Sequence, residues 1–175
     1  MKEVIEKFIK NYHFSNIPLI TNCRNSAPIL KKVQSSLSLD MGTASIGGDG
    51  PAVRENKVSS NQALEHVLES EIKQLLGKGI STNSITILSP LPFANSAASK
   101  LSGKFAITEL DEYSVRSLPI AELSFSEIKN FKGLESDVVI LIELGNPRHL
   151  SKTSEKVLHY VAMSRARTLL SIIWN

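Results

Sequence analysis

Val138-Val139-Ile140-Leu141-Ile142 is the longest aliphatic run in a chain of 175 residues. Charged residues bound it on both sides, with Asp137 before it and Glu143 after it. A strand that is apolar at every position, rather than at every second one, is typical of a parallel sheet with both faces covered. The run therefore predicts a buried strand, and it predicts helices on both sides of that strand's sheet.

The segments around this run predict alternating helices and strands. Helices are expected over 2–13, 27–37, 61–76, 94–101 and 154–167, and strands over 17–21, 52–54, 85–88 and 169–174, with one or two short strands between 105 and 123. Ser26 is expected to cap the helix that begins at Ala27, with Pro28 in its first turn. The glycine-rich segment 40–60 is expected to be a long surface loop. Together these elements predict a single α/β domain over 1–175, with a mostly parallel sheet.

The composition is ordinary for a soluble protein, with 42% hydrophobic and 21% charged residues. No apolar run approaches the length of about 20 residues that spans a membrane, so no membrane partner is expected. The charged N-terminal segment has no apolar stretch typical of a secretory signal, and the single cysteine, Cys23, fits a reducing compartment. A cytoplasmic location is therefore expected. The net charge of +3 permits contact with nucleic acid without arguing for it.

Several common catalytic patterns are missing. Gly42 to Asp49 has the glycine spacing of a P-loop, but Gly48 stands where the lysine belongs and Asp49 where Ser or Thr belongs. The chain is therefore expected to lack a P-loop of its own. The four histidines and Cys23 have no metal-ligand spacing, so no metal site is predicted. A self-contained hydrolase is not visible.

Three segments remain as candidates for chemistry. They are Leu19–Ser26, which presents Arg24; Phe131–Asp137, which presents Glu135 after a Gly133 turn; and Tyr160–Arg167, which places Arg165 and Arg167 on an otherwise apolar helix. Arginine stays charged and offers a planar fork of donors that suits phosphate. Ligands of open parallel sheets gather at the carboxyl ends of the strands, so Arg24 is expected at that edge. A lone arginine there is more often a surface ion pair, and only the combination carries weight.

These three segments, in this order, resemble motifs IV, V and VI of the second RecA-like domain (domain 2A) of UvrD/Rep-type superfamily 1 DNA helicases. The motifs would lie at about 19–26, 127–142 and 158–167. The motif V core Lys-Gly-Leu-Glu is present at 132–135. The motif VI core Tyr-Val-Ala-aliphatic-Thr-Arg-Ala is present at 160–166, with Ser164 in place of Thr. The resemblance implies a RecA-like fold of the P-loop NTPase type.

The resemblance also implies a role for particular residues. ATP would lie between two RecA-like domains, and Arg24 and Arg165 would be the catalytic arginines that reach its γ-phosphate. Glu135 would approach the ribose, with Lys132 and Gly133 supporting its turn. The Walker A lysine and the Mg²⁺-binding acids would belong to an N-terminal RecA-like domain of the same larger protein. This chain alone is therefore expected not to hydrolyse ATP.

The sequence departs from the family at two places. Cys23 replaces the motif IV aromatic residue that can stack on adenine. Before the motif V core, Lys129 and Asn130 could contact a phosphate of single-stranded or duplex DNA, with RNA not excluded, whereas Glu127 would oppose one. Arg167 has no family role and is expected to be ion-paired or solvated. These departures leave a second hypothesis open, in which the domain is a stand-alone nucleic-acid-binding or protein-interaction module without ATPase activity.

Overall fold

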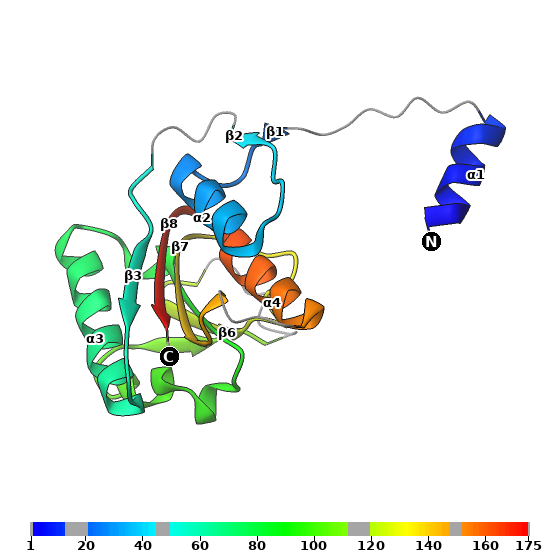
Figure 1. Cartoon of the computed structure of the whole chain (residues 1–175). Helices are drawn as coiled ribbons and strands as arrows, with labels where there is room; N and C mark the ends of the chain where they lie inside the picture. Colours follow the sequence, from blue (N-terminus) through cyan, green and yellow to red (C-terminus); the bar gives the residue numbers. More distant parts are fainter. Residues whose placement is uncertain (1, 13–20, 45–49, 112–119, 148–151, 175) are drawn as a thin grey trace.

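The computed structural model describes residues 2–12, 21–44, 50–111, 120–147 and 152–174 (Figure 1). Its main feature is a sheet of six strands in the order β3-β8-β7-β4-β6-β5, and every pair of neighbouring strands is parallel. The strands are β3 (Arg54–Lys57), β4 (Ile85–Ser89), β5 (Ile107–Glu109), β6 (Leu123–Glu127), β7 (Ser136–Leu144) and β8 (Ala166–Trp174). The predicted parallel α/β architecture is confirmed.

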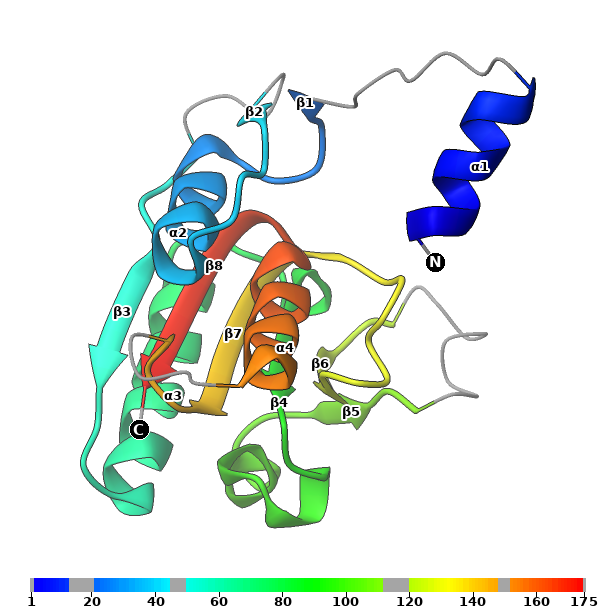
Figure 2. The same ribbon diagram turned by 45° about the vertical axis from the view of Figure 1, so that its right-hand side comes forward.

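The aliphatic run lies in β7, in the interior of this sheet, and its side chains alternate between two cores. Val139 and Leu141 pack with the helices α2 (Ala27–Leu37) and α4 (Thr153–Ser164). Val138, Ile140 and Ile142 pack on the other face with α3 (Asn61–Gly77) and the short 3₁₀ helix η3 (Ala97–Leu101). Figure 2 shows α2 and α4 together on one side of the strands. Both faces are thus covered, which is why every position of the run 138–142 is apolar.

Four of the five predicted helices are confirmed as α-helices, with changes at their ends. The first, α1 (Lys2–Tyr12), stands apart from the layered body in both views (Figures 1 and 2). The segment expected as one helix over 94–101 forms two 3₁₀ helices, η2 (Phe93–Asn95) and η3, and a third, η1 (Thr82–Ser84), precedes β4. No helix in the described part of the chain has the length and apolar character that crossing a membrane requires.

The prediction for 154–167 was wrong at its C-terminal end. The helix α4 stops at Ser164, Arg165 is its C-cap, and Arg167 already belongs to β8. Backbone pairing explains the difference, because Ala166 pairs with Ser136 at the start of β7. Arg165 and Arg167 therefore do not share a helix face. They lie on either side of the junction between a helix and a strand.

The region around the first short strand also differs from expectation. Residues 17–20 of the strand predicted over 17–21 lie outside the described residues. The part that is described, β1 (Thr21–Asn22), pairs with β2 (Thr43–Ala44) in a separate two-stranded sheet. Within the segment expected as loop, β2 is an additional strand. The edge strand predicted at 52–54 lies further along the chain, as β3, which shares only Arg54 with the prediction and stands at the edge of the main sheet beside β8.

Candidate functional site

The three candidate segments meet at the amino edge of the sheet, where β7 and β8 begin. Glu135 and Arg165 directly precede Ser136 and Ala166, which are register partners of these two strands. The backbone N–H of Ser136 donates to the carbonyl oxygen of Arg165 at 3.1 Å. The expectation that Arg24 lies at the carboxyl edge was therefore wrong. The strand before it belongs to the small sheet, and its turn reaches the opposite edge of the main sheet.

A short polar turn positions Arg24. The side-chain oxygen of Asn22 accepts from the backbone N–H groups of Arg24 and Asn25, each at 3.0 Å. The side-chain amide of Asn25 then donates to the carbonyl oxygens of Ser164, at 3.0 Å, and Ala166, at 2.6 Å. This turn therefore fixes the segment of Arg24 directly to the backbone on both sides of Arg165.

The next residue fixes the same turn a second time. Ser26 precedes α2 with extended backbone, as a cap residue does, but its side chain makes no capping hydrogen bond. Its hydroxyl instead donates to the carbonyl oxygen of Thr168 at 3.1 Å. Its backbone N–H donates to the carbonyl oxygen of Arg167 at 2.9 Å. Gly50 lies so close that an added Cβ would stand 2.6 Å from the Cβ of Ser26.

Arg24, Glu135, Arg165 and Arg167 form a group that we call the arginine cluster, and Glu135 is the acid at its centre. One carboxylate oxygen lies 3.3 Å from Nε of Arg24, and the other lies 3.7 Å from Nε of Arg167. Arg167 also reaches Asp137, with 3.6 Å between Nη1 and Oδ1. The expected ion pairing of Arg167 is thus observed. All four ion-paired side chains are about half exposed, so each pair contributes little to stability, and the groups remain available to a ligand.

Arg165 is much more buried than Arg24 and Arg167. Only 9% of the residue is exposed, and its guanidinium donates to the carbonyl oxygens of Val161 at 3.1 Å and Leu134 at 3.3 Å. A further contact joins it to the hydroxyl of Ser164 at 3.4 Å. Burial and, second, the positive charge of Arg24 lower the pKa of Arg165 below its ordinary value.

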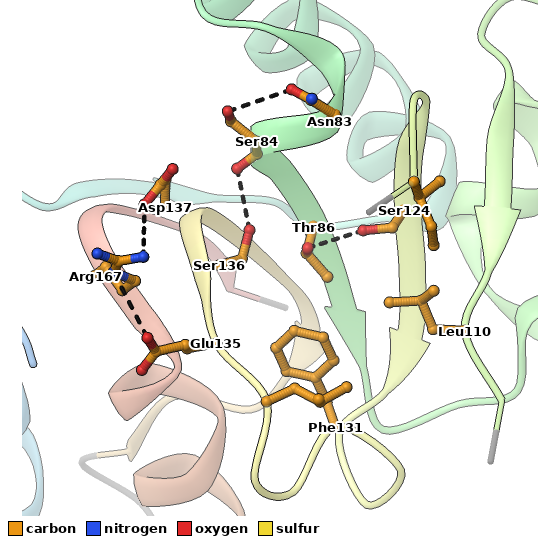
Figure 3. A pocket seen from close by; sticks show the side chains of 12 residues that line it. Asn83, Ser84, Thr86, Leu110, Ser124, Phe131, Glu135, Ser136, Asp137 and Arg167 are labelled. Carbon is orange, nitrogen blue, oxygen red and sulfur yellow. Dashed lines mark hydrogen bonds and ion pairs between the residues drawn. The ribbon is translucent and has the colours of Figure 1, made fainter. Parts of the chain in front are cut away.

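Two cavities adjoin the cluster. One has a volume of about 800 Å³, and its lining includes Arg24, Glu135, Tyr160 and Arg167. We call it the arginine pocket. Arg165 is not one of the described residues that line it. The second cavity, of about 510 Å³, shares Glu135 and Arg167 with the first. Figure 3 shows these two side chains at its wall.

The turn that carries Glu135 depends on a glycine, as predicted. Gly133 has φ +93°, a conformation that L side chains rarely adopt. Lys132 beside it is exposed and makes no ion pair with the residues that the structure describes. Both residues adjoin the cluster in sequence, but the structure gives Lys132 no contact with Arg24 or Arg165.

Lys129 and Asn130 lie elsewhere. They follow the carboxyl end of β6, whereas Glu135 precedes the amino end of the parallel strand β7. The ammonium group of Lys129 is exposed and pairs with Glu127 at 2.8 Å. The sequence-based candidates therefore divide into an arginine cluster at one edge of the sheet and a weakly basic turn at the other.

Sequence reasoning missed Asn25 and Ser26 as positioning residues. Both are polar and 2% exposed, and burial of a polar side chain requires hydrogen-bond partners. Their partners lie 139 to 142 residues away along the chain, so no local pattern could identify them. Among the residues that the structure describes, no group of three or more His, Cys, Asp or Glu side chains is arranged to hold a metal ion.

Comparison with known proteins supports the fold. No family model and no curated protein matches the sequence. A solved structure, the C-terminal domain of a possible DNA helicase from Lactobacillus plantarum WCFS1, matches with a TM-score of 0.65 and 15% identity over 87% of this chain and 88% of that chain. The structure of PRRSV helicase matches with a TM-score of 0.37 and 14% identity over 90% of this chain and 23% of that chain, which is too low to establish a shared fold. The chain therefore has the RecA-like α/β fold of a helicase C-terminal domain.

Proposed function

We propose that this chain is the second motor domain of an ATP-dependent superfamily 1 helicase of the UvrD/Rep type. Arg24 and Arg165 contact the γ-phosphate of ATP, Glu135 contacts the ribose, and Lys132 and Gly133 support the turn of Glu135. An N-terminal RecA-like domain of the same larger protein supplies the Walker A lysine and the acids that bind Mg²⁺. Nucleic acid, with DNA as the first candidate, runs past Lys129 and Asn130.

One observation carries this proposal. Arg24, Glu135 and Arg165 come from segments far apart in the sequence, and the structure brings them to one edge of one sheet. Guanidinium groups gathered in this way suit phosphoryl transfer, because negative charge spreads over the phosphoryl oxygens in the transition state. Arg24 is half exposed and Arg165 is nearly buried, and the side chain of Asn25 fixes the backbone that carries them, so the two charges are organised before any ligand arrives.

The locations of the arginine cluster and of the turn with Lys129 are also compatible with a motor enzyme. The arginine cluster and the turn of Lys129 lie at opposite ends of the strands, so the nucleotide and the nucleic acid do not compete for one surface. In such an enzyme, closure of two domains on ATP and their reopening after hydrolysis move the domains along a strand. The helix-to-strand junction at Arg165 would connect the nucleotide directly to β8, an interior strand of the sheet.

A second function has a specific observation in its favour. The guanidinium of Arg165 already donates to Val161, Leu134 and Ser164 and is 9% exposed. An arginine satisfied by its own protein can serve structure alone. In that case the chain is a binding module for nucleic acid or another protein, with the helicase fold and without ATPase activity.

The two functions are separated by steady-state ATPase measurements on the larger protein that contains both domains. Arg24→Ala changes a half-exposed side chain, so the fold should survive, and the rate should fall by about 10³-fold or more. Arg165→Lys keeps the positive charge but loses the planar fork of donors, so the ATPase rate of this variant should also fall. Lys100→Ala changes an exposed lysine away from the cluster and serves as the control.

The outcome is clear in each case. Loss of ATPase activity in both arginine variants, with circular dichroism like that of the unchanged protein, supports the motor. Unchanged activity in Arg24→Ala means that the cluster does not contact the γ-phosphate, and the proposal fails. Because Arg24 is exposed, an unfolded Arg165 variant cannot obscure the result.

A further inference from the structure

The cavity of about 510 Å³ lies beside the arginine pocket, at the amino ends of β4, β6 and β7. The two cavities share the side chains of Glu135 and Arg167. Figure 3 shows the shared pair at the wall of the cavity, with Phe131 on the side of the turn that follows β6. We call this second space the hydroxyl cavity, because four of its lining residues are Ser84, Thr86, Ser124 and Ser136.

The lining of the hydroxyl cavity combines hydroxyl groups with apolar side chains. The hydroxyls of Thr86 and Ser124 lie 2.8 Å apart, and the hydroxyl of Ser136 donates to the carbonyl oxygen of Ser84 at 3.0 Å. The lining also includes aliphatic and aromatic side chains, among them Leu110 and Phe131. A lining of this kind suits a flat ring with an apolar face and polar edges.

The charges of the cavity decide which part of a ligand it accepts. Its lining contains two carboxylates, Glu135 and Asp137, and Arg167 is the one cation among the described residues that line it. Arg167 is already paired with both carboxylates. A phosphate in this cavity would meet repulsion, whereas sugar hydroxyls and ring N–H groups can donate to the carboxylate oxygens. The phosphates of a ligand therefore belong in the arginine pocket next door.

We propose that the hydroxyl cavity binds the nucleoside part of a nucleotide, its sugar and base, while the phosphates lie at Arg24 in the arginine pocket. This inference rests on the proposed function, which supplies the phosphates. A volume of about 510 Å³ lies within the range of roughly 300–1,000 Å³ typical of small-molecule sites. Glu135, shared by both spaces, then meets the sugar at the point where the phosphate chain begins. A base bound in this cavity would not need an aromatic residue at position 23, where this chain has Cys23.

The test uses amide chemical shifts of the 175-residue chain by NMR, with three ligands at millimolar concentration. Adenosine should shift amides around the cavity, including those of Thr86, Ser124 and Ser136. Inorganic tripolyphosphate should shift amides of the arginine pocket, including that of Arg24, and leave the cavity unchanged. ATP should shift both sets and bind several-fold more tightly than tripolyphosphate.

Two variants make the test specific. Asn83 is exposed and lines the cavity, so Asn83→Trp should obstruct the space without disturbing the core. It should abolish the adenosine shifts and reduce the ATP affinity to that of tripolyphosphate. The control is Ser81→Trp, which adds the same bulk on the exposed surface two residues away. Ser81 is not among the described lining residues, so this variant should change neither the adenosine shifts nor the ATP affinity.

The failure of this inference differs from the failure of the proposed function. If adenosine causes no shifts around the cavity, or if Asn83→Trp leaves ATP affinity unchanged, the nucleoside site is wrong and the arginine pocket is unaffected. If tripolyphosphate causes no shifts near Arg24 while adenosine still binds, the arginine pocket fails as a phosphate site and the nucleoside site is supported.

Discussion

The side-chain amide nitrogen of Asn25 lies 2.6 Å from the carbonyl oxygen of Ala166, a residue 141 positions later in the chain. The same nitrogen lies 3.0 Å from the carbonyl oxygen of Ser164. Because these two acceptors flank Arg165, one amide group fixes the spacing between the turn of Arg24 and the end of α4. Hydrogen bonds to backbone acceptors, rather than contacts between the two arginines, hold the positive cluster together.

Asn25→Ala should therefore destabilise the fold. The substitution removes two buried hydrogen bonds and leaves buried carbonyl oxygens without those partners, a cost of about 1–3 kcal/mol in the free energy of unfolding. Urea denaturation followed by circular dichroism measures this difference. Ser35→Ala, which removes an exposed hydrogen bond of 3.1 Å to Lys32, is the control and should cost less than about 0.5 kcal/mol. Equal stabilities of the two variants would contradict the role given to Asn25.

Gly133→Ala should also destabilise the protein, and for a different reason. No atom lies within 4 Å of the position of an added Cβ, so the cost comes from φ +93° alone and should be about 1 kcal/mol. Gly77→Ala is the matched control, because its added Cβ also meets nothing and its φ is not positive. At the end of α3 that change should stabilise the protein by about 0.5 kcal/mol. Urea denaturation that shows the same sign for both variants would contradict this account.

Much of the sheet was predictable from local sequence. The aliphatic run of β7 and the helical spacing of α2 and α3 report burial that each element experiences along its own length. The end of α4 was not predictable in the same way. Ala166 and Arg167 favour helix by intrinsic propensity, but pairing with β7 draws them into β8. Tertiary pairing overrides a weak local preference at this junction.

The candidate site was predictable only in part. The residue types of the arginine cluster could be identified, because Arg24, Glu135 and Arg165 lie in short segments with a recognisable order. Their location was not predictable, because the strand before Arg24 belongs to a separate two-stranded sheet. The ion pair between Glu127 and Lys129 could have been considered from their spacing alone, since Glu127 ends β6 and Lys129 follows two residues later.

Glu69 should make the stability of the fold depend on pH in the acid range. Hydrogen bonds from Lys104, at 2.6 Å, and then Lys73, at 2.7 Å, lower the pKa of this carboxyl from 4.5 to about 2. A depressed folded-state pKa means that the stabilising contribution is present above about pH 4.5 and is lost as the pH falls to about 2.

Urea midpoints measured at intervals between pH 5 and pH 2 should therefore fall less steeply in Glu69→Gln than in the unchanged protein. The two lysine partners are more than half exposed, so high salt should reduce the difference by screening their charges. The same slope in both proteins at low salt would show that Lys104 and Lys73 do not hold this carboxylate in solution. The location of the group, on α3 away from the arginine cluster, keeps this test independent of nucleotide binding.

Glu127 should weaken nucleic-acid binding at the carboxyl edge of the sheet. Its carboxylate neutralises Lys129 at 2.8 Å, so a phosphate that approaches Lys129 must displace it. Glu127→Gln should tighten binding of a single-stranded oligonucleotide and steepen the dependence of log K on log salt concentration by up to about 1. Lys129→Ala should do the reverse, and Lys31→Ala, an exposed lysine on α2, should change neither.

Fluorescence anisotropy over a series of salt concentrations measures both quantities. The pair of variants at 127 and 129 separates a contact from a general effect of charge, because Glu127→Gln and Lys31→Ala alter the net charge by one unit in opposite directions. If binding followed net charge alone, Lys31→Ala would weaken it as much as Lys129→Ala does. That equality would remove Lys129 from the proposed track and, with it, the reason to place nucleic acid at the end of β6.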